Sequence, residues 1–447
     1  MSSFSGSAIL WQVFPLGALG APGTNPEVEG RDYQPPRTLR DLEPWLDHAV
    51  RIGANVLSLG PIFHSYSHGY DTIDYYRIDP RLGTLADFKS LVEAAHARGV
   101  KIVLDGVFNH VGSRHPLVEG LRHGPSEDAQ MLLPNWDGWA EGELPSYHCF
   151  EGHTGLATLN HANPRVREAI TNVMNHWLDL GADGWRLDAA YAMAPSVWTD
   201  ILPKVRSRHA DAWIVAEVIH GEYADMVSES GWDCLTEYEL WKATWSALND
   251  ANFYELDWTL GRHNELLDTF VPQTFIGNHD VTRIATQLEN EEQVGVAAAI
   301  LFSVGGVPSI YYGDEMGFTG RKEERLGGDD AIRQPLPDSP EQAMQDPRAQ
   351  RFFHWYASLC AMRRQRPWLW HARTKVVHLE NEVMRFVSYN GDQAITVVLN
   401  ISDASLPRGS EVLQGCGAPI AGQFDNNALR PNAYAIFDGA CGSDLHS

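Results

Sequence analysis

Two patterns of apolar and polar positions alternate along the first part of the chain. One is typical of buried strands and the other of helices. Short apolar runs at 9–14, 55–59 and 101–108 predict buried strands. Between them, the segments 39–52 and 85–98 place apolar residues three and four positions apart and end at a glycine, which predicts helices. Strands that alternate with helices in this way predict βαβ units and a parallel sheet.

The same alternation continues almost to residue 370. Further strands are expected at 183–189, 213–218, 233–238, 274–278 and 308–312, and helices at 164–180, 196–209, 291–304 and 349–366. Eight strands that alternate with helices predict a (β/α)8 TIM barrel. The apolar run 294–312 is long enough for a membrane helix, but Gly305, Gly306 and Pro308 interrupt it. A helix, a turn and a buried strand are therefore expected there.

Two segments depart from this rhythm. Residues 111–159 are rich in Gly, Pro and His and predict an insertion between the third strand and the next helix. From about residue 374 the period changes to two, which predicts strands at 375–378, 383–389 and 394–399. Three parts are therefore expected: a barrel over 1–110 and 160–370, an inserted domain over 111–159, and a C-terminal antiparallel β-sandwich over 371–447.

Composition excludes several classes of partner. The chain has 447 residues, with 34 Lys and Arg against 58 Asp and Glu, and its net charge is −24. Such a charge repels nucleic acid and anionic membrane surfaces, and it favours a neutral ligand. No Lys or Arg precedes Arg31, so the basic region of a signal peptide is missing and a cytoplasmic location is expected. The oligomeric state is left open.

The five cysteines, at 149, 234, 360, 416 and 441, form no CxxC pair and show no metal-ligand spacing. An odd number of cysteines argues against a full disulfide framework. We expect reduced structural thiols of the kind usual in the cytoplasm. Cys416 and Cys441 could still pair within the last domain.

The predicted fourth strand carries the most informative polar pair, Arg186 and Asp188. Side chains alternate along a strand, so these two point to the same side. A guanidinium beside a carboxylate lowers the pKa of that carboxylate, and an ionised, oriented carboxylate is suited to act as a nucleophile. The alternative is a buried ion pair with a purely structural role.

Three other predicted strands also end in polar residues, and in a barrel such strand ends meet at one rim. The third ends at Asp105 and is followed by Asn109 and His110, the fifth ends at Glu217, and the seventh ends at Asn278, His279 and Asp280. We expect Asp105 to be structural and Asn109 to brace the insertion. Metal binding through His110 and His279 is a rival interpretation, but no HxH or HExxH spacing supports it.

These strand ends predict glycoside hydrolysis with retention, which needs two carboxyl groups about 5 Å apart. Asp188 suits the nucleophile. Glu217 follows an apolar run, 213–216, which would raise its pKa toward that of an acid. Asp280 could hold sugar hydroxyls and stabilise the transition state, and neutral histidines at 110 and 279 could donate hydrogen bonds to hydroxyls.

The chain resembles the α-amylase family, glycoside hydrolase family 13, over nearly its whole length. The motifs that carry the resemblance are 105–110, 184–190, 215–218 and 275–280, the short segment 156–160, the loop 68–75 and the strand region 305–315. The resemblance implies that Asp188 is the nucleophile, Glu217 the acid and base, and Asp280 the transition-state stabiliser. Tyr70 would stack on the sugar at the cleavage site, and Arg186, His110 and His279 would also contact substrate.

The resemblance also raises expectations about more distant sugar contacts and about calcium. Asp329 and Arg333 are similar to a glucose-binding pair of the family; the alternative is a surface ion pair of little energetic value. Many members continue the nucleophile strand with Lys-His, where this chain has Tyr191 and Ala192, so the leaving-group side is expected to be poorly furnished. Calcium is possible, with Asn109 a weak candidate ligand beside Asp128 and Asp137; no cofactor is expected to be required for the chemistry.

The expected function is therefore cleavage of α-1,4-glucosidic bonds in starch-type glucans and maltooligosaccharides by double displacement, with short products such as maltose or glucose. The nearest alternative is a transglycosylase or α-glucosidase of the same family that acts on maltose, sucrose or trehalose. A non-catalytic glucan-binding relative is a further alternative, but all three carboxylates of the motifs are present.

Overall fold

The computed structural model of the protein describes residues 5–325, 327–425 and 427–442. Its centre is an eight-stranded parallel sheet in the order β12-β11-β10-β5-β2-β1-β14-β13. The strands are β1 (Leu10–Val13), β2 (Val56–Leu59), β5 (Lys101–Gly106), β10 (Gly184–Leu187), β11 (Trp213–Ala216), β12 (Cys234–Leu235), β13 (Gln273–Phe275) and β14 (Val307–Tyr311). A parallel bridge between Thr236 and Gln273 joins the two edge strands, so the sheet closes into the predicted TIM barrel.

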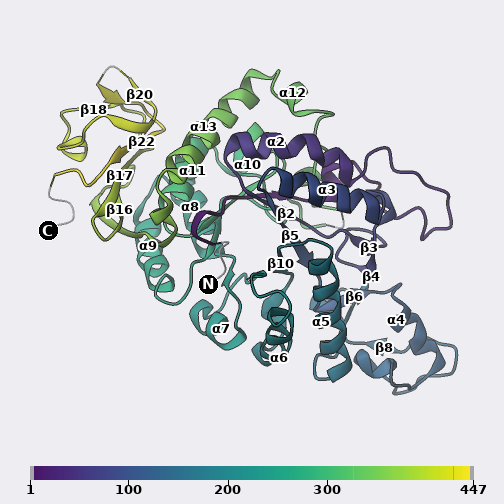
Figure 1. Ribbon diagram of the computed structural model, residues 1–447. Coiled ribbons are helices and arrows are strands. Elements are labelled where there is room, and N and C mark those ends of the chain that lie inside the picture. Colours follow the sequence, from purple (N-terminus) through teal and green to yellow (C-terminus); the bar gives the residue numbers. More distant parts are fainter. Residues whose placement is uncertain (1–4, 326, 426, 443–447) are drawn as a thin grey trace.

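Helices surround the barrel (Figure 1). The longer ones are α2 (Glu43–Ile52), α3 (Leu85–Ala97), α5 (Pro164–Asp179), α6 (Pro195–Arg206), α7 (Tyr223–Ser230), α8 (Tyr238–Asn249), α9 (Tyr254–Leu266), α11 (Gln293–Ser303) and α13 (Pro347–Arg364). The shorter ones are α1 (Pro15–Ala18), α4 (Pro116–Gly120), α10 (Ile284–Gln287) and α12 (Pro340–Ala343). Helices α7, α8 and α9 were not predicted; all others of eight residues or more fall where the spacing predicted them.

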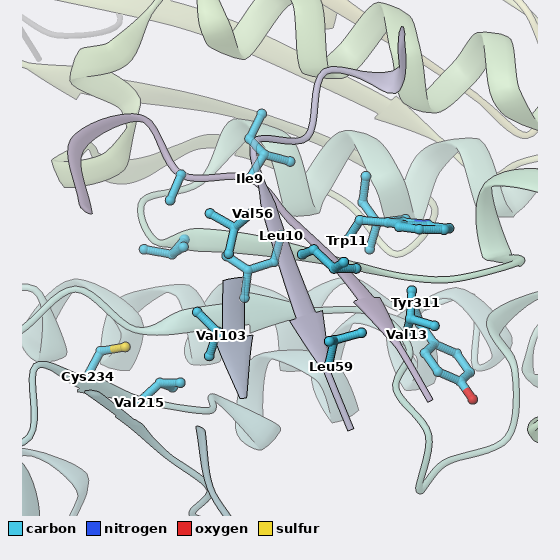
Figure 2. Close-up of a cluster of buried hydrophobic side chains, with 14 of the residues drawn as sticks. Ile9, Leu10, Trp11, Val13, Val56, Leu59, Val103, Val215, Cys234 and Tyr311 are labelled. Carbon is cyan, nitrogen blue, oxygen red and sulfur yellow. The ribbon is translucent and has the colours of Figure 1, made fainter. Parts of the chain in front are cut away.

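The barrel is filled by apolar side chains from the parallel strands. Figure 2 shows residues of β1, β2, β5, β11, β12 and β14 meeting in one buried cluster, among them Leu10, Val56, Val103 and Val215. Strands buried on both faces have nearly continuous apolar sequences, which explains why they were easy to recognise. Every residue of α11 is buried, and β14 follows after a turn at Gly306. Within the described chain, no helix is long and apolar enough to span a membrane.

The predicted insertion starts and ends in an antiparallel strand pair, β6 (His110–Gly112) with β9 (Leu156–Thr158). It also holds α4 and a two-residue pair, β7 (Pro134–Asn135) with β8 (Ser146–Tyr147). A further hairpin, β3 (Phe63–Ser65) with β4 (Thr72–Ile78), lies between β2 and α3 and was not predicted. These elements cover the rim at which β5 ends.

The C-terminal segment forms two antiparallel sheets on the side of the barrel opposite to the insertion (Figure 1). One has the order β15-β16-β17-β22-β19, and the other the order β18-β21-β20. Their bounds are β15 (Arg373–Leu379), β16 (Val383–Asn390), β17 (Gln393–Asn400), β18 (Leu406–Pro407), β19 (Pro419–Gly422), β20 (Phe424–Asp425), β21 (Ala428–Leu429) and β22 (Ala433–Asp438). Residues of both sheets share one hydrophobic cluster, so the expected antiparallel β architecture is confirmed.

The cysteine pair that the sequence left open, Cys416 and Cys441, is formed, and the other three cysteines are free thiols as expected. Cys416 and Cys441 form a disulfide that ties the loop after β18 to the residues after β22. Cys149, Cys234 and Cys360 carry free thiols. Cysteine usage therefore no longer supports the expected cytoplasmic location, which stays a prediction.

Candidate active site

The polar residues predicted at the strand ends meet at one rim of the barrel because of the strand register. Arg186 of β10 is paired with Asp105 of β5 on one side and with Val215 of β11 on the other. The backbone amide of Asp188 donates to the carbonyl of Gly106 (3.1 Å), and that of Glu217 donates to the carbonyl of Leu187 (2.9 Å). Asp188 and Glu217 therefore follow the ends of the adjacent strands β10 and β11, at nearly the same level of the sheet.

One guanidinium group, that of Arg186, contacts three carboxylates. Its Nη1 lies 2.8 Å from Asp105 Oδ1 and 3.0 Å from Asp188 Oδ1, and its Nη2 lies 2.6 Å from Glu217 Oε1. All four side chains are at least nine-tenths buried. Buried carboxylates need a compensating charge, so Arg186 holds the cluster together. The structure thus brings together Asp105, Arg186, Asp188 and Glu217.

The expectation that Arg186 sets a low pKa for Asp188 is wrong for this arrangement. Burial raises the pKa of Asp188 well above its usual range and outweighs Arg186, which lowers it. The neighbouring carboxylates of Glu217 and Asp105 raise it further. Burial raises the pKa of Asp105 as well, against the opposing effect of Arg186. One positive charge shared among three carboxylates cannot ionise all of them, so the cluster readily holds a proton.

Glu217 is fixed by two further contacts that the sequence did not reveal. Its Oε2 accepts a hydrogen bond from the backbone amide of Ala189 (2.9 Å), and Tyr238 Oη lies 3.4 Å from its Oε1. Asn278 in turn donates from Nδ2 to the Tyr238 hydroxyl (3.0 Å). Ala189 has a left-handed backbone (φ 44°), which is uncommon for a residue with a side chain and turns its amide toward Glu217. Glu217 is therefore oriented from three elements.

Asp280 lies on the opposite flank and is held by two cationic or ionisable neighbours. Arg333 Nη2 lies 2.8 Å from its Oδ1, and His279 Nε2 lies 2.9 Å from its Oδ2. Burial raises the pKa of Asp280, but the neighbouring His279 and Arg333 lower it by a larger amount. The pKa of Asp280 therefore lies below its usual range. Asp280 therefore carries a negative charge at neutral pH.

Arg333 is mainly a support for Asp280. Its side chain is only 10% exposed; it lies over the ring of Phe14 at 4.4 Å and donates from Nε to the carbonyl of His279 (3.0 Å). Asp329 Oδ2 lies 3.0 Å from Arg333 Nη2. The ion pair between Asp329 and Arg333 is therefore present, but its Arg333 end is buried and also bridges to Asp280.

His279 is clamped between two aromatic rings. Tyr70 and Phe14 each lie parallel to it, with centroids at 5.7 and 5.8 Å. Gln12 Nε2 lies 3.1 Å from His279 Nδ1, and the Tyr70 hydroxyl contacts His279 Nε2 and donates to Asp105 Oδ2 (3.2 Å). Tyr70 thus links the Asp280 flank to the carboxylate cluster.

His110 is buried at the foot of the insertion. Its Nε2 lies 3.1 Å from the backbone carbonyl of Tyr70, and Asn109 Nδ2 lies 3.2 Å from its Nδ1. Burial lowers the pKa of His110 to about 4, so the imidazole is neutral at pH 7. A neutral ring agrees with the expected role as a hydrogen-bonding group without a fixed charge.

The calcium site that the family resemblance raised stays a prediction, and two of its three candidate ligands, Asn109 and Asp128, have partners within the protein. Asn109 is buried and directed at His110, and Asp128 is paired with Arg165 at 2.7 Å. Over the described parts of the chain, no group of three or more His, Cys, Asp or Glu side chains is placed to hold a metal ion.

The flank beyond Glu217 holds residues that the sequence reasoning missed. Tyr191 follows Asp188 by three positions, and its ring lies near those of Phe150 and His220, with centroids at 6.5 and 5.9 Å. Its hydroxyl donates to Glu151 Oε1 at 2.8 Å. Aromatic rings thus lie where Lys-His is absent, and the expectation that the leaving-group side is poorly furnished stays a prediction. No motif marks Phe150 and Glu151, because they come from the insertion.

Comparison with known proteins agrees with this geometry. The family model "Alpha amylase, catalytic domain" matches residues 39–384. Neopullulanase 2 of Thermoactinomyces vulgaris is 29% identical over 88% of this chain and 69% of its own length, and a cyclomaltodextrinase of Bacillus sp is 30% identical over 62% and 51%. The chain thus spans about half to two-thirds of these curated relatives.

A solved structure extends the comparison to the whole fold. The cyclic α-maltosyl-(1→6)-maltose hydrolase of Arthrobacter globiformis, in complex with maltose, matches with a TM-score of 0.80 and 26% identity. The match covers 97% of this chain and 99% of that one. The likeness therefore includes the insertion and the C-terminal sheets as well as the barrel.

Proposed function

The chain belongs to the α-amylase family, and from that premise we propose that it is a retaining glycoside hydrolase of α-1,4-linked glucose oligomers. The observation that carries the proposal is the Arg186 cluster, in which one guanidinium group holds Asp188 and Glu217 together. Retention requires two closely spaced carboxyl groups, one as a nucleophile and one as a proton donor. The relatives' names, neopullulanase and cyclomaltodextrinase, support an α-glucan substrate.

In the proposed mechanism, an oxygen of Asp188 attacks the anomeric carbon while Glu217 gives its proton to the glycosidic oxygen. The bond to the leaving sugar breaks, and a glycosyl ester of Asp188 forms. Glu217, now ionised, then takes a proton from water, and that water displaces Asp188 with a second inversion. The net result is an α-configured product.

Asp280 and its neighbours act on the sugar at the point of cleavage. The negative charge of Asp280, maintained by His279 and Arg333, would stabilise the positive charge that develops on the sugar ring in the transition state. Preorganised charge of this kind needs no rearrangement during the reaction. His110 and His279 would contribute hydrogen bonds to hydroxyls, and Tyr70 would form the wall against which the ring lies.

A substrate panel tests the function directly. Maltooligosaccharides, starch, pullulan, sucrose and trehalose are each incubated with the enzyme, and the products are separated by thin-layer chromatography. We expect cleavage of maltooligosaccharides to maltose and glucose. Turnover of sucrose or trehalose alone would instead favour an α-glucosidase of small substrates.

Transfer to a sugar acceptor is the second candidate, because aromatic rings at Phe150, Tyr191 and His220 could hold an acceptor beside Glu217. Product analysis at high maltose concentration separates the two. Products longer than maltose would show transfer, whereas glucose alone would show hydrolysis.

The pH dependence should depend on the leaving group. For maltotriose, kcat/KM should be bell-shaped, because Asp188 must be ionised and Glu217 protonated. Since burial raises the pKa of Asp188, the acid limb should lie above the ordinary aspartate value of about 3.9. Fluoride leaves without a proton, so α-maltosyl fluoride should show the acid limb but not the alkaline one. Matching alkaline limbs on the two substrates would mean that Glu217 is not the acid.

Arg333→Ala should impair long and short substrates alike. Arg333 contacts Asp280 directly, so its loss displaces that carboxylate, and a misplacement of this kind can cost about 100-fold. We expect similar losses of kcat/KM on maltotetraose and on α-maltosyl fluoride. Asp329→Asn, which removes a partner that does not hold Asp280, should have a smaller effect. If Arg333→Ala impaired only maltotetraose, Arg333 would be a ligand for remote glucose units, as the sequence alone suggested.

A further inference from the structure

Arg283 is a fully buried arginine that lies three positions after Asp280 and takes no part in the proposed chemical steps. Removing a guanidinium group from water is costly, so the contacts that offset this cost are informative. Its Nη1 donates to the backbone carbonyl of Tyr312 (2.8 Å) and to Asp314 Oδ1 (2.9 Å). Both acceptors follow the end of β14, so Arg283 joins the loop after β13 to the loop after β14.

Aromatic rings from β14 and from the residues after it surround this guanidinium group. The Cζ atom of Arg283 lies 4.4 Å from the ring centroid of Tyr311, 5.2 Å from that of Tyr312 and 5.3 Å from that of Phe318. A cation this close to aromatic rings is attracted to them, and more strongly where water is excluded. The backbone amide of Arg283 also donates to the carbonyl of Gly320 (3.0 Å). Arg283 is therefore fixed through both its side chain and its backbone.

Two of these rings also hold the segment that carries Arg333. The Tyr311 hydroxyl donates to the backbone carbonyl of Ile332 (2.9 Å), and the Tyr312 hydroxyl donates to that of Gln334 (2.8 Å). These two carbonyls lie immediately before and after Arg333 in the chain. The segment of Arg333 is therefore attached to the same rings that surround the buried guanidinium group.

The contacts of Arg283 thus meet those of Arg333 on both sides of Asp280. Arg333 Nη2 contacts Asp280 Oδ1 at 2.8 Å, and Arg283 belongs to the same loop as Asp280. On the other side of that loop, the Asp314 carboxylate packs so closely on Gly277 that a Cβ atom at Gly277 would clash with its Oδ2. The loop that carries Asp280 is therefore held at Gly277 before it and at Arg283 after it.

We propose that Arg283 is a positioning residue that fixes the loop after β13 against the segment of Arg333, so that Asp280 is in place before the substrate binds. The proposal rests on the proposed function, because it takes Asp280 as the group that stabilises the transition state. A charge already in place needs no rearrangement during the reaction, and a misplacement of about 1 Å can cost about 100-fold in rate. Arg283 is fully buried, so it acts through Asp280 and not on the sugar.

Arg283→Met tests this role, because methionine keeps an apolar chain but removes the cation and its hydrogen bonds. With α-maltosyl fluoride, which needs no proton from Glu217, we expect kcat to fall about 10- to 100-fold and KM to change by less than about threefold. The loss falls on kcat because Asp280 acts on a charge that the sugar acquires only in the transition state. Both constants are measured below the thermal unfolding midpoint of the variant.

Arg363→Met is the matched control for loss of a buried arginine. Arg363, on α13, is also buried and donates to backbone carbonyls, but its acceptors precede β14, whereas those of Arg283 follow it. We expect a lower thermal unfolding midpoint in both variants. In Arg363→Met, however, kcat should stay within about twofold of the wild-type value, because the flank of Asp280 is not disturbed.

A double-variant cycle with Asp280→Asn separates a positioning role from a general loss of structure. If Arg283 acts by holding the charge of Asp280, its loss should matter little once that charge is gone. Adding Arg283→Met to Asp280→Asn should therefore change kcat on α-maltosyl fluoride by less than about threefold. The full 10- to 100-fold loss in this background would mean that Arg283 does not act through Asp280.

A milder variant tests the same connection without removing a buried charge. Tyr311→Phe combined with Tyr312→Phe keeps both rings around Arg283 but releases the two carbonyls beside Arg333. We expect kcat to fall by about threefold or more, the lower end of the value of one to two hydrogen bonds. This variant decides the question if Arg283→Met does not fold: an unchanged kcat would overturn the positioning role.

The outcomes separate this inference from the proposed function. If the wild-type enzyme does not turn over α-maltosyl fluoride, the proposed function is wrong. If the wild type is active but kcat in Arg283→Met stays within about twofold of it, or falls no more than in Arg363→Met, only the positioning role of Arg283 is wrong.

Discussion

Asp188→Asn should abolish turnover while leaving the fold intact. The change removes the proposed nucleophile, and the loss of a nucleophile costs an enzyme roughly 10⁴-fold or more in kcat. Stability should not fall, because burial disfavours the charge on Asp188 and an amide carries none. The checks are kcat on maltotriose and the midpoint of thermal unfolding.

A second variant guards against contamination by wild-type enzyme. Asp188→Ala leaves room for azide, which can attack the anomeric carbon of α-maltosyl fluoride from the nucleophile's side. We expect azide to restore turnover and to yield a β-configured maltosyl azide. Asp188→Asn with near wild-type kcat and an unchanged unfolding midpoint would remove Asp188 from the mechanism.

Arg186→Ala should destabilise the protein strongly, and more so at high pH. It leaves three buried carboxylates without their shared cation, and breaking a buried pair costs about 3–5 kcal/mol. The raised pKa of Asp188 and Asp105 would rise further without Arg186. A group whose pKa is raised by folding favours the folded state at low pH and loses that contribution as pH increases through the folded pKa. The free energy of unfolding should therefore fall less at pH 5 than at pH 8.

Arg363 offers a matched control for that pH dependence. It is as buried as Arg186, but it donates to the backbone carbonyls of Phe302, Val304 and Gly306. Arg363→Ala should therefore destabilise by a similar amount at both pH values. Urea denaturation of the two variants at pH 5 and pH 8 makes the comparison. If the free energy of unfolding falls by the same amount at both pH values in Arg186→Ala, then Arg186 does not stabilise the ionised form of these carboxylates.

The barrel could be predicted from the sequence because its strands are buried on both faces. Runs such as 102–104 and 213–216 are apolar without interruption, and a glycine closes several of the helices in the barrel. The weakest prediction, at 233–238, corresponds to the two-residue strand β12, where a single bridge closes the barrel. Helices α7, α8 and α9 fall around that point and were not predicted.

Only the site residues that directly follow strand ends could be predicted from the sequence. Asp188, Glu217 and Asp280 follow strand ends, so barrel geometry alone brings them to one rim. Tyr238 lies at the start of the unpredicted helix α8, and Phe150 and Glu151 lie in the insertion, so no predicted element fixed their positions. The sign of the Asp188 pKa shift was also missed, because it depends first on burial, which raises that pKa, and then on the neighbouring carboxylates that share Arg186.

Trapping of the glycosyl-enzyme tests the central claim most directly. In Glu217→Gln, α-maltosyl fluoride can still form the ester, because fluoride needs no proton, but no base remains to activate water. Intact-mass and peptide mass spectrometry should therefore show one maltosyl group on the peptide that contains Asp188. A maltosyl group on Asp105 or Asp280, or release of β-maltose without any covalent species, would contradict double displacement through Asp188.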